Sequence, residues 1–157
     1  MKRIVFLVVT MMMGALGVNA AEPFVVFQAS ADALSLKDAS ISFDANEHSC
    51  MQRAVANLQQ DFQRVTGRTI LSGQSGKTIL IGTVGCNKQI DQWVKKGELR
   101  DLKGKTEKYI IKTIGDQLVI AGSDKRGTVF GIYELSKQMG VSPWYDWADV
   151  PIEKHPQ

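Results

Sequence analysis

The chain has few of the residues from which metal centres and nucleophilic active sites are built. Its 157 residues include two histidines, His48 and His155, and two cysteines, Cys50 and Cys86. His48 stands two residues before Cys50, but two ligands do not make a metal site, and the sequence offers no evident third. No serine stands in a G-x-S-x-G pattern, so a hydrolase nucleophile of that kind has no support. We therefore expect neither a bound metal nor a cofactor.

The chain also has only a small excess of positive over negative charge. The formal net charge is +3, and residues 1–20 contribute Lys2 and Arg3 but no acidic residue, so the remaining chain carries +1. Recognition of nucleic acid calls for lysines and arginines clustered on one face. The pairs Lys95-Lys96 and Lys103-Gly-Lys105 are better explained as solvated loop charges. Nucleic acid is therefore not an expected partner.

One long apolar run is present, at the N-terminus, and it has the features of a secretory signal. Lys2 and Arg3 precede an apolar stretch over residues 4–13, and the small residues Val18 and Ala20 stand where a signal peptidase cleaves. The run is short for a membrane anchor, which needs ~20 residues, and no cysteine follows the cleavage point as a lipoprotein requires. We expect residues 1–20 to be a signal peptide removed after Ala20, with a periplasmic or secreted product that has no stable membrane anchor.

Export changes the interpretation of the two cysteines. In an oxidising compartment Cys50 and Cys86 can form a disulfide, which would stabilise the fold by ~3–4 kcal/mol in the chain-entropy model. The alternative is two free thiols, and the sequence does not measure their separation. Both interpretations stay open.

The remaining chain alternates strand and helix patterns. Apolar periodicity predicts strands at residues 24–27, 41–43, 78–82, 109–114 and 117–121, the last two joined as a hairpin at Gly115-Asp116. It predicts helices from Asn46 or Ser49 to Gly67, from Asn87 to Gly97 and from about Arg126 to Met139. Strands and helices alternate along the chain, which indicates parallel pairing, but one pair of strands forms an antiparallel hairpin. The sheet is therefore expected to be mixed. The predicted fold class is α/β (α+β), a two-layer sandwich with amphipathic helices packed on a mixed sheet.

The last helix carries further expectations. Asp124 is its predicted N-cap, with Arg126 in a buried ion pair to Asp124. Val129, Ile132, Tyr133, Leu135 and Met139 share an arc that should face the sheet. Gly127 and Gly131 cost helix propensity, which indicates close backbone packing.

An aromatic connector follows. Residues 21–142 are the predicted α/β domain, and residues 143–157 open with three large rings, Trp144, Tyr145 and Trp147. Such side chains need something to pack against. We therefore expect residues 143–157 to lead toward a second domain. We expect no interdomain linker before Pro143.

Two carboxylates of this connector stand close to its tryptophans in the sequence. Asp146 lies between Trp144 and Trp147, and Asp149 follows Trp147 by two residues. Glycoside hydrolysis uses a pair of carboxylates ~5–10 Å apart, and tryptophans commonly stack on sugar rings. The candidate substrate-binding residues are therefore Trp144, Asp146, Trp147 and Asp149. The alternative is that the tryptophans fasten this domain to its partner and that the aspartates are ordinary connector residues. No residue is assigned a catalytic role.

The stretch that carries these features also resembles a known family. Residues 121–151, AGSDKRGTVFGIYELSKQMGVSPWYDWADVP, resemble the end of the N-terminal domain of glycoside hydrolase family 115, the xylan α-glucuronidases. The turn at residues 126–128 and the aromatic exit resemble, more loosely, the accessory domain of families 20 and 67. Upstream, residues 54–67 and 78–85 fit the helix and strand of the same domain.

The resemblance implies a function for the whole enzyme. It implies a two-layer accessory domain that precedes a catalytic barrel, the partner of this domain. The barrel would bind the polysaccharide and release glucuronic acid from xylan by an inverting, water-mediated mechanism. It places no catalytic role on Asp146 or Asp149, so the chain alone is expected to be inactive. Two alternatives remain: the accessory domain of another exo-glycosidase, such as a hexosaminidase, and a stand-alone binding module or inactive remnant.

Overall fold

A computed structural model describes residues 24–28, 33–73 and 77–155. The predicted signal peptide at residues 1–20 lies outside the described residues. Within the described ranges no helix is long and apolar enough to span a bilayer.

The described residues form one mixed sheet. Its strands are β1 (Ser40–Phe43), β2 (Thr78–Thr83), β3 (Tyr109–Ile114) and β4 (Gln117–Gly122), in the order β1-β2-β4-β3. β1 pairs with β2, and β2 with β4, in parallel, while β3 and β4 form an antiparallel hairpin. The parallel pairs require crossover connections, and helices supply them. The predicted mixed sheet and its hairpin are confirmed.

Local sequence signals set the helix boundaries. The helices are α1 (Cys50–Thr66), α2 (Lys88–Lys96), α3 (Lys125–Gln138) and the single turn α4 (Tyr145–Ala148), with a 3-10 turn η1 (Arg100–Leu102). α1 ends at Gly67, whose φ of 74° is the left-handed conformation that glycine tolerates. The Asn87 side chain accepts hydrogen bonds from the Gln89 and Ile90 amides and so caps α2. The three longer helices lie where the sequence predicts them.

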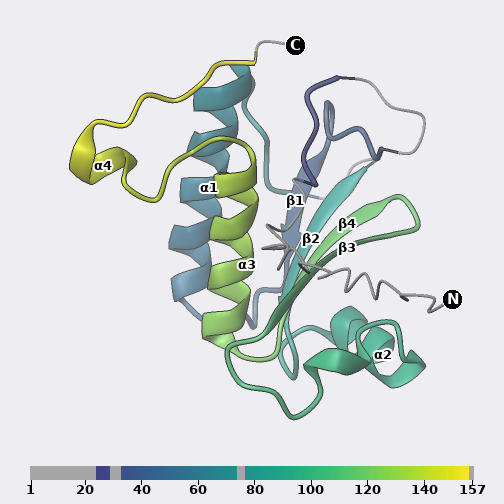
Figure 1. The fold of residues 1–157 in the computed structure, drawn as a ribbon. Helices are drawn as coiled ribbons and strands as arrows, with labels where there is room; N and C mark the ends of the chain where they lie inside the picture. Colours follow the sequence, from purple (N-terminus) through teal and green to yellow (C-terminus); the bar gives the residue numbers. More distant parts are fainter. Residues whose placement is uncertain (1–23, 29–32, 74–76, 156–157) are drawn as a thin grey trace, which may run out of the picture.

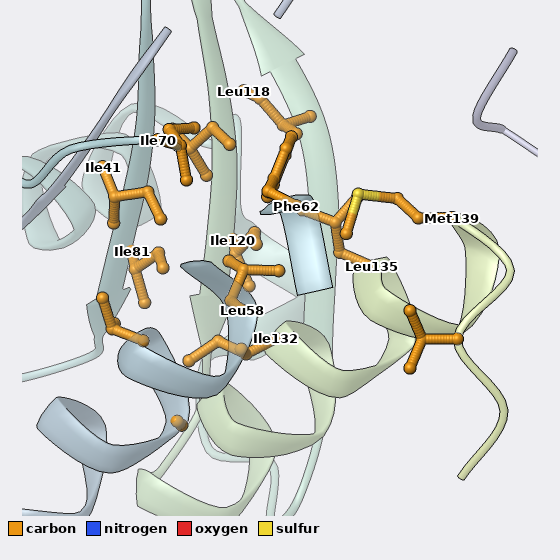
Figure 2. Packing of buried hydrophobic residues seen from close by; sticks show 14 of the residues in the cluster. Ile41, Leu58, Phe62, Ile70, Ile81, Leu118, Ile120, Ile132, Leu135 and Met139 are labelled. Carbon is orange, nitrogen blue, oxygen red and sulfur yellow. The ribbon is translucent and has the colours of Figure 1, made fainter. Parts of the chain in front are cut away.

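α1 and α3 lie along the sheet, and α2 lies near one end of it (Figure 1). α1 and α3 lie against one face, where Figure 2 shows Ile41, Ile81 and Ile120 of the strands beside Leu58, Phe62, Ile132 and Leu135 of the two helices. Leu80, Val119 and Ala121 point to the opposite face, because alternate strand residues do so. There they pack with Ile90, Leu99 and Leu102 from α2, the following loop and η1. The predicted α/β sandwich is confirmed, and α2 adds a partial layer across the sheet.

The glycines of α3 allow its close approach to the sheet. A Cβ on Gly131 would lie 2.8 Å from Ile120 Cγ2 and 3.2 Å from Tyr109 Cβ, and one on Gly127 would clash with the Lys108 carbonyl. The expected close backbone packing of this helix is therefore confirmed.

Two local predictions are wrong. Residues 24–27 form no strand; the outer edge of β1 is taken instead by the 71–73 segment, where the Ile41 amide donates to the Leu71 carbonyl and the Gly73 amide to the Ile41 carbonyl. Tyr133 does not face the sheet. It is exposed, and its hydroxyl accepts a hydrogen bond from the Asn57 side chain at 2.8 Å.

Candidate functional site

The carboxyl edge of the parallel strands is the usual ligand position in open α/β sheets, but here protein groups fill it. The buried hydroxyls of Thr83 and Thr128 lie 2.7 Å apart. Glu47 Oε1 accepts a hydrogen bond from the Thr83 amide at 2.6 Å, and Glu47 Oε2 is buried without a hydrogen-bond partner among the described residues. A Cβ on Gly82 would lie 2.7 Å from Ile90 Cγ1. These contacts join the loop after β1 to β2, α2 and the start of α3, so this edge serves as scaffold.

His48 lies beside Cys86, a proximity that sequence reasoning missed because the residues are 38 positions apart. The His48 Nε2 and Cys86 Sγ atoms are 3.7 Å apart. Burial, and then the negative charges of Glu47, Asp91 and Asp44, raise the pKa of the Cys86 thiol, which favours the protonated form. No group of three or more histidine, cysteine, aspartate or glutamate residues in the described ranges could hold a metal ion.

The two cysteines are free thiols in the structure, with Cys50 exposed and Cys86 partly buried. Pairing of Cys50 with Cys86 in the exported protein stays a prediction. Labelling of thiols under denaturing, non-reducing conditions tests it.

The turn into α3 is held by backbone contacts. Asp124 Oδ1 accepts from the Gly127 amide at 2.8 Å, and Oδ2 accepts from the Glu107 amide at 2.7 Å. These two hydrogen bonds are the main causes that lower the pKa of Asp124. The predicted N-cap is confirmed. The predicted buried pair of Asp124 with Arg126 is wrong, because Arg126 is mostly exposed and its guanidinium pairs with Glu107 at 2.7 Å.

The aromatic connector presents two of its three rings to solvent. Trp144 is 66% exposed and Trp147 is 86% exposed. They stand three residues apart across the single turn of α4, so they lie on one side of it. Asp149, also exposed, follows in a left-handed conformation with φ of 48°. The side chain of Asp146 lies outside the described part of the chain, so its separation from Asp149 stays untested.

Tyr145 fastens the connector to the domain. The Arg64 guanidinium lies 4.8 Å from the centroid of the Tyr145 ring, and Arg64 is itself held by Asp61 at 3.0 Å. Tyr145 and Ile152 also pack against the core between the sheet and α1. The connector is therefore anchored on one side while its tryptophans project from the other.

The chain beyond α4 returns across the end of α1. The His155 amide donates to the Val65 carbonyl at 2.7 Å. The His155 ring stacks on Phe27, with centroids 3.7 Å apart and planes 10° apart. No local sequence pattern predicts this contact, because Phe27 and His155 are 128 positions apart.

Comparison with known proteins gives a family and a structural relative. The family described as glycosyl hydrolase family 67 N-terminus matches residues 28–135. A solved structure of a family 115 4-O-methyl-α-glucuronidase with specificity for decorated arabinogalactans matches 74% of this chain, with 33% identity and a TM-score of 0.64. A family 138 enzyme that targets pectin rhamnogalacturonan II matches 71% of the chain, with 14% identity and a TM-score of 0.43. Comparison with curated proteins gives no match.

The matches cover most of this chain but little of the relatives. The chain spans 15% of the family 115 enzyme and 14% of the family 138 enzyme. The family match covers well over half of the chain, from before β1 to the last turn of α3. The chain belongs to the family of N-terminal domains of glycosyl hydrolase family 67, and it is similar to the corresponding part of a family 115 4-O-methyl-α-glucuronidase.

Proposed function

We propose that this chain is the N-terminal accessory domain of an exported glycoside hydrolase that releases glucuronic acid from substituted xylan. The observation that carries the proposal is the similarity to the family 115 enzyme, at 33% identity over 74% of this chain. Because the chain spans 15% of that enzyme, catalysis belongs to another domain of the complete polypeptide.

The role of this domain is to position and support that catalytic domain. Two observations support a scaffold: the carboxyl edge of the sheet is filled by the Thr83–Thr128 contact, and the exposed tryptophans stand on an anchored connector. Trp144 and Trp147 bind the catalytic domain. Asp146 and Asp149 are connector residues, and the chain alone has no glycosidase activity.

Decorated arabinogalactan is a second candidate substrate. The family 115 relative has specificity for such polysaccharides, whereas the resemblance of residues 121–151 to xylan α-glucuronidases favours xylan.

Export completes the proposal. Lys2 and Arg3, the apolar run after them and the small residues Val18 and Ala20 support cleavage after Ala20. The mature protein then begins at Ala21 in the periplasm or outside the cell. N-terminal sequencing of the exported protein tests this, and a membrane-bound product that retains residues 1–20 would refute it.

The functional test starts from the gene. We expect the reading frame to continue past Gln157 into a catalytic domain, and the complete polypeptide to release uronic acid from glucuronosylated xylo-oligosaccharides. Release from decorated arabinogalactan alone would favour the second substrate. Hydrolysis of terminal hexosaminides instead would favour a hexosaminidase. A stop codon after Gln157 would favour a stand-alone binding module or an inactive remnant.

A further inference from the structure

Two exposed rings lie on the outer side of α3. Phe130 and Tyr133 are each 42% exposed, and they stand one turn apart. Their neighbours in the same helix, Ile132 and Leu135, are buried against the sheet. Phe130 and Tyr133 therefore project away from the core of the domain.

Contacts to α1 relate these rings to the connector. Tyr133 accepts a hydrogen bond from Asn57, and Tyr145 of the connector packs on Arg64. Asn57 and Arg64 are seven residues apart, so they lie on the same side of α1, two turns or about 10 Å apart. Figure 1 shows α4 on the side of α1 away from the sheet. Tyr133 and α4 thus adjoin one side of the helical layer.

Four exposed rings therefore lie on one side of the molecule. We name them the outer aromatic surface: Phe130, Tyr133, Trp144 and Trp147. We propose that this surface is a single interface for the catalytic domain of the same polypeptide. The proposal rests on the proposed function above and extends it, because it places half of the interface on α3, outside the connector.

The size of the relatives favours this occupant. The chain spans 15% of the family 115 enzyme, so the remaining domains of such an enzyme are tethered to this one and reach it at a high effective concentration. The other face of the sheet is partly covered by α2 and η1, whereas no described element covers these four rings. Aromatic residues are enriched at the centre of protein interfaces, which makes these exposed rings suited to docking.

The charges around the rings define the partner surface. Arg126 lies with its guanidinium carbon 5.7 Å from the Phe130 ring centroid and is paired with Glu107. Arg64 beside Tyr145 is paired with Asp61. Since both guanidinium groups are neutralised within this domain, the partner need not supply opposite charge. The surface fits a neutral, largely apolar patch on the partner.

Hydroxyl-radical footprinting compares the same side chains in two proteins, residues 21–157 and the complete polypeptide. We expect each ring of the outer aromatic surface to be oxidised several-fold more slowly in the complete polypeptide. Leu71, which is 68% exposed beside the outer edge of β1, should react equally in both and serves as the control. Equal oxidation of the four rings in both proteins, while the complete polypeptide releases uronic acid, would overturn the interface and leave the proposed function intact.

Two further outcomes also decide the matter. Absence of any glycosidase activity in the complete polypeptide would remove the proposed function, and with it the partner named here. Protection of the rings in residues 21–157 alone, by a rise in protein concentration or by added xylo-oligosaccharide, would assign the surface to a second copy or to carbohydrate and would refute the proposal.

A pair of variants adds an independent test. Phe130→Ser with Tyr133→Ser should lower the thermal unfolding midpoint of the complete polypeptide by several degrees and leave that of residues 21–157 nearly unchanged. The conservative change Tyr133→Phe should have little effect on either protein. Equal losses in both proteins would mean that the two rings support only their own domain.

Discussion

The imidazole ring of His155 stacks on the phenyl ring of Phe27 at a centroid distance of 3.7 Å, and this contact joins the segment before β1 to the segment after α4. The adjacent backbone hydrogen bond from His155 to Val65 holds both against the end of α1. Ile152 and His155, which belong to the predicted connector, thus pack on this domain.

Replacement of His155 should test this closure. A stacked aromatic pair contributes about 0.5–1.5 kcal/mol beyond its buried area, so His155→Ala should lower the free energy of unfolding by about 1 kcal/mol in urea melts. Lys154→Gln is the matched control, because the neighbouring Lys154 side chain is exposed. An unchanged midpoint for His155→Ala would show that the closure does not stabilise the fold.

The buried hydroxyl pair at the carboxyl edge should be sensitive to loss of one partner. Thr128→Val leaves the Thr83 hydroxyl buried without its 2.7 Å partner, which should cost about 1–3 kcal/mol. In the double variant Thr83→Val with Thr128→Val neither hydroxyl is left unpaired, so part of that loss should be recovered. Strictly additive losses in denaturant melts would contradict a direct interaction between the two hydroxyls.

Asp124 predicts a pH dependence of stability. Its folded-state pKa is lowered, chiefly by the hydrogen bonds from the Gly127 and Glu107 amides, so the carboxylate stabilises the fold at any pH above its unfolded pKa of about 3.9. The contribution is lost as the pH falls below that value and through the folded pKa. Asp124→Ala should therefore cost about 0.5–2 kcal/mol at pH 7, and the difference from the unmodified protein should shrink below about pH 4. A difference that stays constant down to pH 2 would contradict the role of the charged cap.

Truncation of the exposed tryptophans should show whether their side chains form an interface or belong to the core of this domain. Trp144→Ser with Trp147→Ser should improve the solubility of residues 21–157 and change its stability by less than about 0.5 kcal/mol per site, as exposed positions do. Removal of a core tryptophan costs ~3–5 kcal/mol. Tyr145→Ser is the contrasting variant, because Tyr145 packs on Arg64 and the core. A large loss of stability without a gain in solubility for the double tryptophan variant would exclude the docking role.

The sequence predicts those parts of the fold that depend on local signals. Asn87 begins α2, Gly67 ends α1, and Gly115-Asp116 turns the hairpin, and each lies where the pattern predicts it. The strand predicted at residues 24–27 fails for a long-range reason. A strand at residues 24–27 could join β1 only along its outer edge, and the 71–73 segment occupies that edge.

The candidate site depends more on distant contacts, and less of it could be predicted. Tyr133 fits the apolar arc of α3 in the sequence. In the structure its ring is exposed, and its hydroxyl accepts a hydrogen bond from Asn57 on the neighbouring helix α1. Arg126 pairs with Glu107 across a turn, because the amides of Glu107 and Gly127 already occupy both oxygens of Asp124. The exposure of Trp144 and Trp147 agrees with the expectation drawn from an aromatic cluster that lacks a partner in this domain.

The most direct measurement compares uronic acid release by residues 21–157 and by the complete polypeptide, each incubated with glucuronosylated xylo-oligosaccharides. An accessory domain that supports catalysis elsewhere predicts no release from residues 21–157 and steady release from the complete polypeptide. The contradicting result is turnover by residues 21–157 alone that disappears on Asp146→Asn or Asp149→Asn, because the connector carboxylates would then carry the chemistry themselves.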